Sequence, residues 1–136
     1  MKIKFYIPGT PQGKARPRFT KTGRTYTPKK TADYENTVRL MYRRVCGNAK
    51  FEKGVGLKMN ITAYFGIPKS TSKKKIAQML KGSIRPTKKP DADNIAKVIA
   101  DSLNGVAYHD DAQLVEVNVR KFYREHEGVE VEIEEV

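Results

Sequence analysis

Leu57-Lys-Met-Asn-Ile-Thr-Ala-Tyr-Phe65 is the stretch of this chain that most clearly decides its fold. Apolar residues stand at every second position from 57 to 65, and more polar residues occupy the positions between them. Successive side chains of a strand point to opposite faces of a sheet, so this period of two predicts a strand with one buried face. The fold should therefore contain a sheet with an apolar layer packed on one side.

Three other segments carry the same alternation and predict three more strands. They are residues 2–7, residues 115–119 with valine at each odd position, and residues 129–133. Residues 124–128, which include Gly128, are the expected turn between the last two strands.

Three segments between these strands show helical spacing instead. Residues 31–46 predict a helix capped by Thr31, with one apolar face made of Tyr34, Val38, Met41, Tyr42 and Val45. Residues 70–80 predict a short capped helix ended by Gly82, with Ile76, Met79 and Leu80 pointing inward. A third helix should follow Pro90, with Asp93 or Asn94 as its N-cap, and should end at Gly105. Helices interspersed among the four strands, with no repeat and no linker, predict a single α+β domain over residues 1–136, a small mixed sheet packed with helices.

Length and composition limit the function classes. A chain of 136 residues favours one domain, and no apolar run approaches the roughly 20 residues of a transmembrane helix. Pro8, Gly9 and Pro11 interrupt the start before a signal-peptide core could form. The lone Cys46 cannot form an internal disulfide. We expect a cytoplasmic protein that does not interact with membranes.

The net charge of +12 is unevenly distributed along the chain. Residues 1–89 carry 23 basic and three acidic side chains, whereas residues 90–136 carry four basic and twelve acidic ones. A surplus of this size predicts a polyanionic partner, with DNA, RNA and anionic lipid all compatible. The alternative is that the charge serves solubility alone.

Two basic segments are the candidate contacts to a nucleic-acid backbone. Residues 8–30 hold seven Lys or Arg side chains among prolines and glycines and predict an ordered loop or a short hairpin. Its aromatic residues Phe19 and Tyr26 could stack on bases or fill a gap under the loop. Residues 85–90 form a stiff basic connector. The candidate DNA-binding residues are Lys14, Arg16, Arg18, Arg85, Lys88 and Lys89.

Carboxylates crowd the stretch from residue 91 to residue 111. Asp93, Lys97 and Asp101 are spaced i, i+4, i+8 and share one helical stripe, which alone would be an ordinary solvated face. Asp91 at one end, and Asp110 with Asp111 at the other, add further negative charge. Crowded carboxylates repel one another unless a cation neutralises them. Oxygen ligands suit a hard ion such as Mg²⁺ or Mn²⁺, which activates water in phosphodiester hydrolysis.

The sequence lacks the motifs of other metal-binding and phosphate-binding sites. Counting from Asp91, an EF-hand would need Gly and Glu where Ala96 and Ser102 stand. One cysteine and the scattered His109 and His126 give no zinc spacing. No glycine-rich phosphate loop is present, so no small-molecule cofactor is expected.

The acidic segment closely resembles the RusA family of Holliday junction resolvases. The resemblance lies in Pro90-Asp91-x-Asp93-Asn94-x-x-Lys97, Asp101-x-Leu103-Asn104-Gly105 and Asp110-Asp111-x-Gln113. A weaker match covers Pro8-Gly9-x-Pro11-x-x-Lys14-x-Arg16-Pro17-Arg18 and Tyr26-Thr-Pro28. Some members carry an unbroken arginine run before the first aspartate, where this chain has Arg85, Lys88 and Lys89 interrupted by prolines.

The resemblance implies a small homodimeric endonuclease, of a kind common in phages and prophages, that cuts four-way DNA junctions in recombination and repair with Mg²⁺ or Mn²⁺. It implies Asp91, Asp93 and Asp111 as metal-binding catalytic carboxylates and Lys97 as the catalytic lysine. Asp110 belongs to the motif in a supporting role. Asp101 would orient Lys97.

Two other functions fit the same residues. The chain could be a nucleic-acid-binding protein without catalysis, whose carboxylates serve helix capping and solubility. It could also be a metal nuclease that acts on flaps or single strands.

Overall fold

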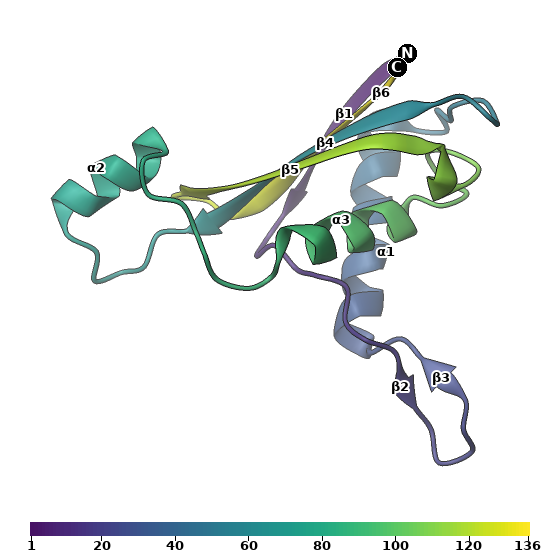
Figure 1. The fold of residues 1–136 in the computed structure, drawn as a ribbon, viewed down its shortest axis with the longest axis horizontal. Helices are drawn as coiled ribbons and strands as arrows, with labels where there is room; N and C mark the ends of the chain where they lie inside the picture. Colours follow the sequence, from purple (N-terminus) through teal and green to yellow (C-terminus); the bar gives the residue numbers. More distant parts are fainter.

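The computed structural model describes all 136 residues and builds them into a four-stranded sheet, a two-stranded hairpin and three α-helices (Figure 1). The elements are β1 (Lys2–Pro8), β2 (Arg18–Phe19), β3 (Thr25–Tyr26), α1 (Lys29–Cys46), β4 (Leu57–Gly66), α2 (Lys73–Lys81), α3 (Ala92–Ser102), the 3₁₀ turn η1 (Asp111–Gln113), β5 (Leu114–Arg124) and β6 (Gly128–Glu135). The predicted α+β class is confirmed. None of the helices is both long and apolar enough to cross a membrane.

The sheet has the strand order β1-β6-β4-β5. β6 pairs antiparallel with β1 and β4, whereas β4 and β5 run parallel. Parallel strands need a long crossover connection, and here residues 67–113, including α2 and α3, supply it.

The turn expected at residues 124–128 is present, but it joins strands that are not neighbours. β5 ends at Arg124 beside Gly66, and β6 begins at Gly128 beside Tyr64. The turn therefore passes across the end of β4. Gly66 leaves room for this crossing, because a Cβ there would lie 3.2 Å from Glu127 Cγ.

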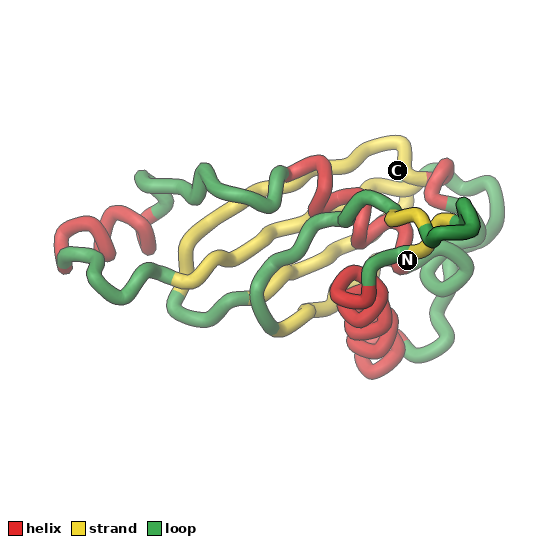
Figure 2. Tube along the Cα trace, turned by 90° about the horizontal axis from the view of Figure 1, so that it is seen from below, coloured by secondary structure: helices red, strands yellow, loops and turns green.

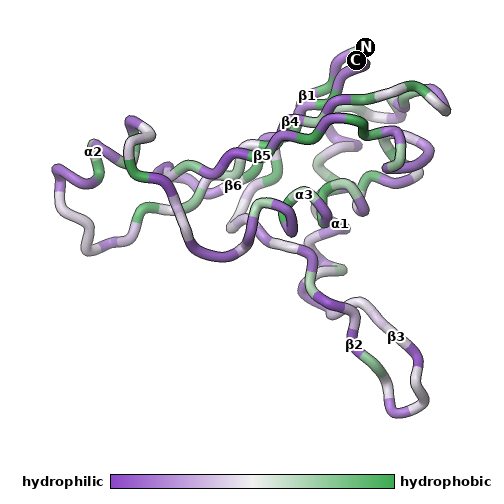
Figure 3. The backbone as a smooth tube through the Cα atoms, in the orientation of Figure 1, coloured by the Kyte–Doolittle hydropathy of each residue, from purple (hydrophilic) through white to green (hydrophobic).

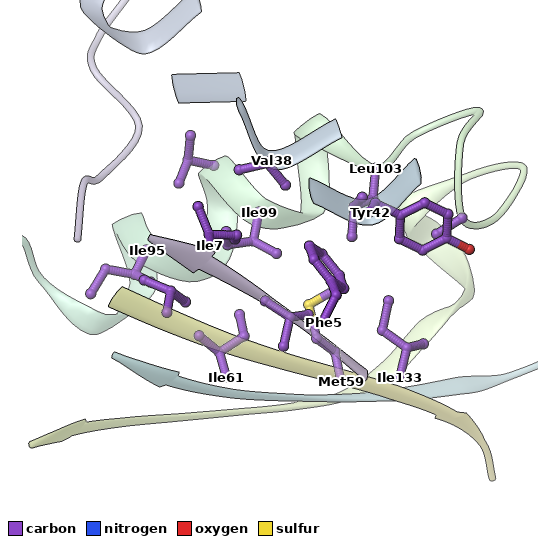
Figure 4. Close-up of a cluster of buried hydrophobic side chains, with 14 of the residues drawn as sticks. Phe5, Ile7, Val38, Tyr42, Met59, Ile61, Ile95, Ile99, Leu103 and Ile133 are labelled. Carbon is purple, nitrogen blue, oxygen red and sulfur yellow. The ribbon is translucent and has the colours of Figure 1, made fainter. Parts of the chain in front are cut away.

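One face of the sheet carries the core. Helices α1 and α3 both lie on this face (Figures 1 and 2). Figure 4 shows the core side chains of sheet and helices meeting between them, with the Phe5 and Tyr42 rings edge to face at 5.4 Å between centroids. The alternation in β1 and β4 predicted this layer correctly: Ile3, Phe5 and Ile7 are buried, as are Leu57, Met59, Ile61, Ala63 and Phe65. The other face carries exposed ion pairs such as Lys2–Glu132, which explains its polar positions.

The helix ends differ from the prediction in three places, one of them the end of α3, which is capped by Leu103 and not by Gly105. Helix α1 begins at Lys29 after Pro28, and Thr31 is buried within its first turn instead of capping it. In α3, the N-cap position belongs to Asp91 and not to Asp93 or Asn94. The cap and stop of α2 at Ser72 and Gly82 are confirmed.

Two residues expected on buried helix faces are exposed. Val45 is 64% exposed because Cys46, not Val45, continues the buried row of Val38 and Tyr42 and packs against the core. Leu80 is 50% exposed because α2 lies at the end of the sheet, away from α1 and α3, and buries only Met79.

Val38 and Val45 provide a matched test of the core, because they are the same residue on the same helix with exposed fractions of 0% and 64%. Val38→Ala should lower the free energy of unfolding by roughly 1.5–3 kcal/mol, since it empties a packed site. Val45→Ala should change it by less than about 0.5 kcal/mol. Urea unfolding followed by circular dichroism measures both, and equal losses would contradict the placement of α1.

Candidate active site

Helix α3 displays the acidic stripe on its outer side. Its inner side is fixed to the sheet by the fully buried Ile95, Val98, Ile99 and Ser102, as the sequence predicted. Asp91 at the N-cap, Asp93 in the first turn and Lys97 are exposed, and Asp101 is half-buried. The positive end of the helix dipole stabilises carboxylates at the first two of these positions. The stripe is therefore a rigid, solvent-facing row of charged side chains.

A second acidic element, Asp110 and Asp111, lies beyond the other end of α3. Asn104 holds Asp111 with two hydrogen bonds: the Asp111 N–H donates to Asn104 Oδ1 at 2.8 Å, and Asn104 Nδ2 donates to Asp111 Oδ2 at 3.3 Å. Asp110 caps η1 by accepting from the Ala112 N–H at 3.1 Å.

Gln113 anchors this acidic element to the body. Its Oε1 accepts from the N–H groups of His109 and Asp110 at 3.0 and 3.2 Å. Its Nε2 donates to the carbonyls of Glu52 and Val55 at 2.9 and 3.1 Å. A buried amide with four partners fixes both carboxylates, so Gln113 is a positioning residue.

The two neighbouring carboxylates have opposite pKa shifts. Hydrogen bonds, chiefly from the Ala112 N–H, lower the pKa of Asp110. Partial burial, together with the charges of Asp101 and Asp110, raises the pKa of Asp111 despite its bond from Asn104. Burial, reinforced by the same acidic groups, also raises the pKa of Tyr108. A nearby cation would offset this rise in the pKa of Asp111.

Lys14 forms a bridge between α1 and α3. Its Nζ lies 2.9 Å from Glu35 Oε2 and 3.3 Å from Asp101 Oδ2. The backbone N–H of Lys14 donates to the Asn94 carbonyl at 3.1 Å. The ion-pair partner of Asp101 in this structure is Lys14, not Lys97, and the expected orienting role of Asp101 toward Lys97 stays a prediction. Lys14 also lines the groove described below, and its expected DNA contact stays a prediction beside this ion-paired role.

The loop that carries Lys14 approaches α3 very closely. At Gly13 a Cβ would lie 2.9 Å from Asn94 Cβ and 3.0 Å from Pro90 Cβ, so only glycine fits without displacement. Sequence reasoning assigned no role to Gly13 or Glu35. The one available signal was that Glu35 is among only three acidic residues in the first 89.

A groove of about 930 Å³ opens between this loop, the start of α1 and the start of α3. Its wall includes Arg16, Arg18, Lys30 and Lys89, with Asp91 at its edge. The groove therefore runs from a basic wall to the first carboxylate of the acidic stripe.

The remaining basic candidates lie along β5. The Arg85 guanidinium stacks on Phe122 at 3.7 Å from the ring centroid, and its Nε donates to the Lys121 carbonyl. Lys121 Nζ donates to the carbonyl of Lys88. These contacts fix the connector against the sheet, and the Lys88 side chain remains exposed. The DNA-binding roles of Arg16, Arg18, Arg85, Lys88 and Lys89 stay predictions.

The carboxylates expected to bind metal do not gather in one chain. No group of three or more His, Cys, Asp or Glu side chains lies close enough together to hold a metal ion. The reason is the length of α3, whose 11 residues separate its ends by about 15 Å at 1.5 Å per residue. Asp91 and Asp93 lie at the start of the helix, and Asp110 and Asp111 beyond its end.

The Lys14 bridge makes a prediction for alkaline pH. Burial lowers the pKa of Lys14, but the hydrogen bonds and charges of Glu35 and Asp101 together leave it raised above the ordinary value of 10.5. The stabilisation is therefore complete below that value and is lost as the pH rises through the raised pKa. Lys14→Met should lower the free energy of unfolding by about 1–2 kcal/mol at pH 8, and the difference from the wild type should shrink above about pH 10.5.

Lys29→Met is the matched control, because the Lys29–Asp33 pair is on the surface with side chains 91% and 62% exposed. This change should alter stability by less than about 0.5 kcal/mol. Urea unfolding at a series of pH values measures both variants. A Lys14→Met deficit that is independent of pH would show that packing, not charge, holds the bridge.

Comparisons with known proteins identify the family to which this chain belongs. Residues 8–134 match the family model described as endodeoxyribonuclease RusA. The uncharacterized protein YqaN of Bacillus subtilis (strain 168) is 38% identical over 98% of this chain and 96% of its own length. The crossover junction endodeoxyribonuclease rusA of Lactococcus phage r1t is 34% identical over 63% of this chain and 60% of its own. With its acidic helix and adjoining basic groove contained in the matched region, the chain belongs to the RusA family of endodeoxyribonucleases.

Proposed function

We propose that this endodeoxyribonuclease is a Mg²⁺-dependent enzyme that resolves Holliday junctions by paired symmetric nicks, as a homodimer in cytoplasmic DNA recombination and repair. The observation that carries the proposal is the continuity of the basic groove with the acidic face of α3, which meet at Asp91. A phosphodiester backbone held in that groove lies beside carboxylates.

The groove supports the DNA part of the proposal. Besides the ion-paired Lys14, the lining presents the four positive charges of Arg16, Arg18, Lys30 and Lys89, and Asp91 is its one acidic residue. Arg16 and Arg18 are exposed and make no ion pair, so both are free to contact phosphates. Release of counterions from the DNA would drive this contact.

The surroundings of Lys97 support its proposed role toward the reacting phosphate. It lies on the same stripe as Asp93, is exposed and has no acidic side chain within ion-pair distance. An unpaired ammonium beside the carboxylates would stabilise the negative charge that develops on the phosphate oxygens during hydrolysis. Asp101, which already binds Lys14, instead supports the loop that leads to Arg16.

The metal and the homodimer are linked in this proposal. Carboxylate oxygens are the donors that Mg²⁺ or Mn²⁺ prefers, but one chain holds Asp91 and Asp93 a helix length away from Asp111. We infer that a second copy, related by a two-fold axis, supplies Asp111 to the Asp91 and Asp93 of the first. Two equivalent sites would follow, which matches two symmetric nicks in a two-fold junction.

Asp91→Asn should retain binding to a four-way junction and lower its cleavage by roughly 100-fold or more, because it removes a carboxylate of the site while keeping the fold. The measurement is cleavage of four-way, flap and linear duplex DNA with Mg²⁺ or with EDTA. Asp33→Asn, the same exchange at an exposed position on α1, is the control and should cleave like the wild type. Equal cleavage by Asp91→Asn and wild type would contradict the site. Preference for flaps or single strands would contradict junction resolution.

A mixing experiment tests whether two chains share a site. Asp91→Asn and Asp111→Asn should each be inactive alone. If each site combines Asp91 of one chain with Asp111 of the other, a mixed dimer has one intact set, and mixing should restore nicking of a single strand. If each set lies within one chain, every site in the mixed dimer remains defective and mixing restores nothing.

A further inference from the structure

The β2–β3 hairpin projects away from the rest of the molecule (Figure 1). Arg18 pairs with Tyr26 and Phe19 with Thr25. The tip is closed by hydrogen bonds from the Thr20 N–H to the Arg24 carbonyl at 2.7 Å and from the Gly23 N–H to the Thr20 carbonyl at 3.0 Å. The Arg24 N–H also donates to Thr20 Oγ1 at 3.2 Å. The hairpin is thus a formed element without a packing partner among the helices and other strands.

The aromatic residues of this hairpin are not used in folding. Phe19 is 73% exposed and Tyr26 is 47% exposed, and the strand register places them on opposite faces of the hairpin. In Figure 3, β2 contains a hydrophobic stretch with hydrophilic chain on both sides of it. Leaving a phenylalanine in water forgoes roughly 1.5–3 kcal/mol of burial energy. This energy is available to a ligand that covers the ring.

The charge around the ring indicates what that ligand is. Arg16, Arg18, Lys21 and Arg24 surround Phe19 in sequence, and no acidic residue occurs between Met1 and Asp33. Four positive charges within nine residues disfavour an apolar protein partner and favour a polyanion. An aromatic ring among cations is the combination that stacks on nucleic-acid bases while the cations hold the backbone.

The hairpin is also continuous with the active site. Arg16, Pro17 and Arg18 form the wall of the groove that reaches Asp91, and Phe19 follows immediately. DNA lying in the groove would therefore meet the hairpin. A two-stranded ribbon has the width that a major groove admits, so the hairpin can enter the duplex from the groove side.

We propose that Phe19 stacks on a base exposed at the branch point of the DNA, where the duplex arms diverge. The proposal rests on the junction-resolving function and gives that function a means of recognising its substrate. Within a continuous duplex each base is covered on both faces, and uncovering one costs a few kcal/mol. At a branch point the terminal base pair of each arm can present a free face. Phe19 therefore favours branched over linear DNA.

The chain contains no tryptophan, which gives a direct test. Phe19→Trp creates a single fluorophore at the proposed stacking position, and Leu80→Trp creates one on α2, at a position 50% exposed and remote from the hairpin. With EDTA present to prevent cleavage, a four-way junction should quench Phe19→Trp and protect it from acrylamide. Linear duplex should do so weakly, and Leu80→Trp should respond to neither DNA.

Binding measurements with Phe19→Ala complete the test. Loss of one stacked base should weaken junction binding roughly 5- to 150-fold, with binding to linear duplex changed less than about twofold. Equal quenching of Phe19→Trp by both DNAs, no quenching, or an unchanged junction preference of Phe19→Ala would overturn the inference. Junction cleavage by the wild type is measured separately. If the wild type does not cleave the junction but the junction still quenches Phe19→Trp, the proposed function is rejected and the stacking inference stands.

Discussion

The parallel pairing of β4 with β5 is the constraint on which the rest of this structure depends. A parallel neighbour cannot be reached by a tight turn, so the chain must leave the sheet and return, and α3 lies on that return path. The apolar stripe of Ile95, Val98 and Ile99 then fixes α3 on the core. Its acidic stripe is thereby directed to solvent. The position of the acidic stripe is thus a consequence of strand direction.

Local patterns in the sequence predicted the elements well because most of them report one buried face. The exception is β5, whose Val115 and Val117 are 61% and 47% exposed. The alternation around Ile61 and the helical spacing around Val98 both depend on the same apolar layer, and both were confirmed. Strand order was not predictable, because alternation says nothing about which strands are neighbours. The crossing of the 124–128 turn over Gly66 is an example, since its sequence is compatible with an ordinary hairpin.

For the candidate site, the sequence predicted which residues share the stripe on α3 but not the tertiary contacts that those residues make. Spacing along α3 correctly placed Asp93, Lys97 and Asp101 on one stripe, of which Asp93 and Lys97 are exposed and Asp101 is half-buried. Spacing could not reveal that Asp101 forms an ion pair with Lys14, which lies 87 positions earlier in the chain. That ion pair depends on the close approach of the loop to α3 at Gly13. Residues brought together by tertiary contacts leave no period in the sequence.

Separation of the carboxylates within one chain has an energetic reason. Aspartates at both ends of α3, held about a helix length apart, avoid the mutual repulsion that would raise their pKa values and oppose folding. Asp111 already has a raised pKa from burial and from Asp101 and Asp110, so a further carboxylate beside it would be unfavourable without a cation. A monomer can therefore fold without metal. In the dimer that we propose, the complete acidic set would assemble only where a second chain, a cation and DNA are present together, and hydrolysis would be confined to that complex.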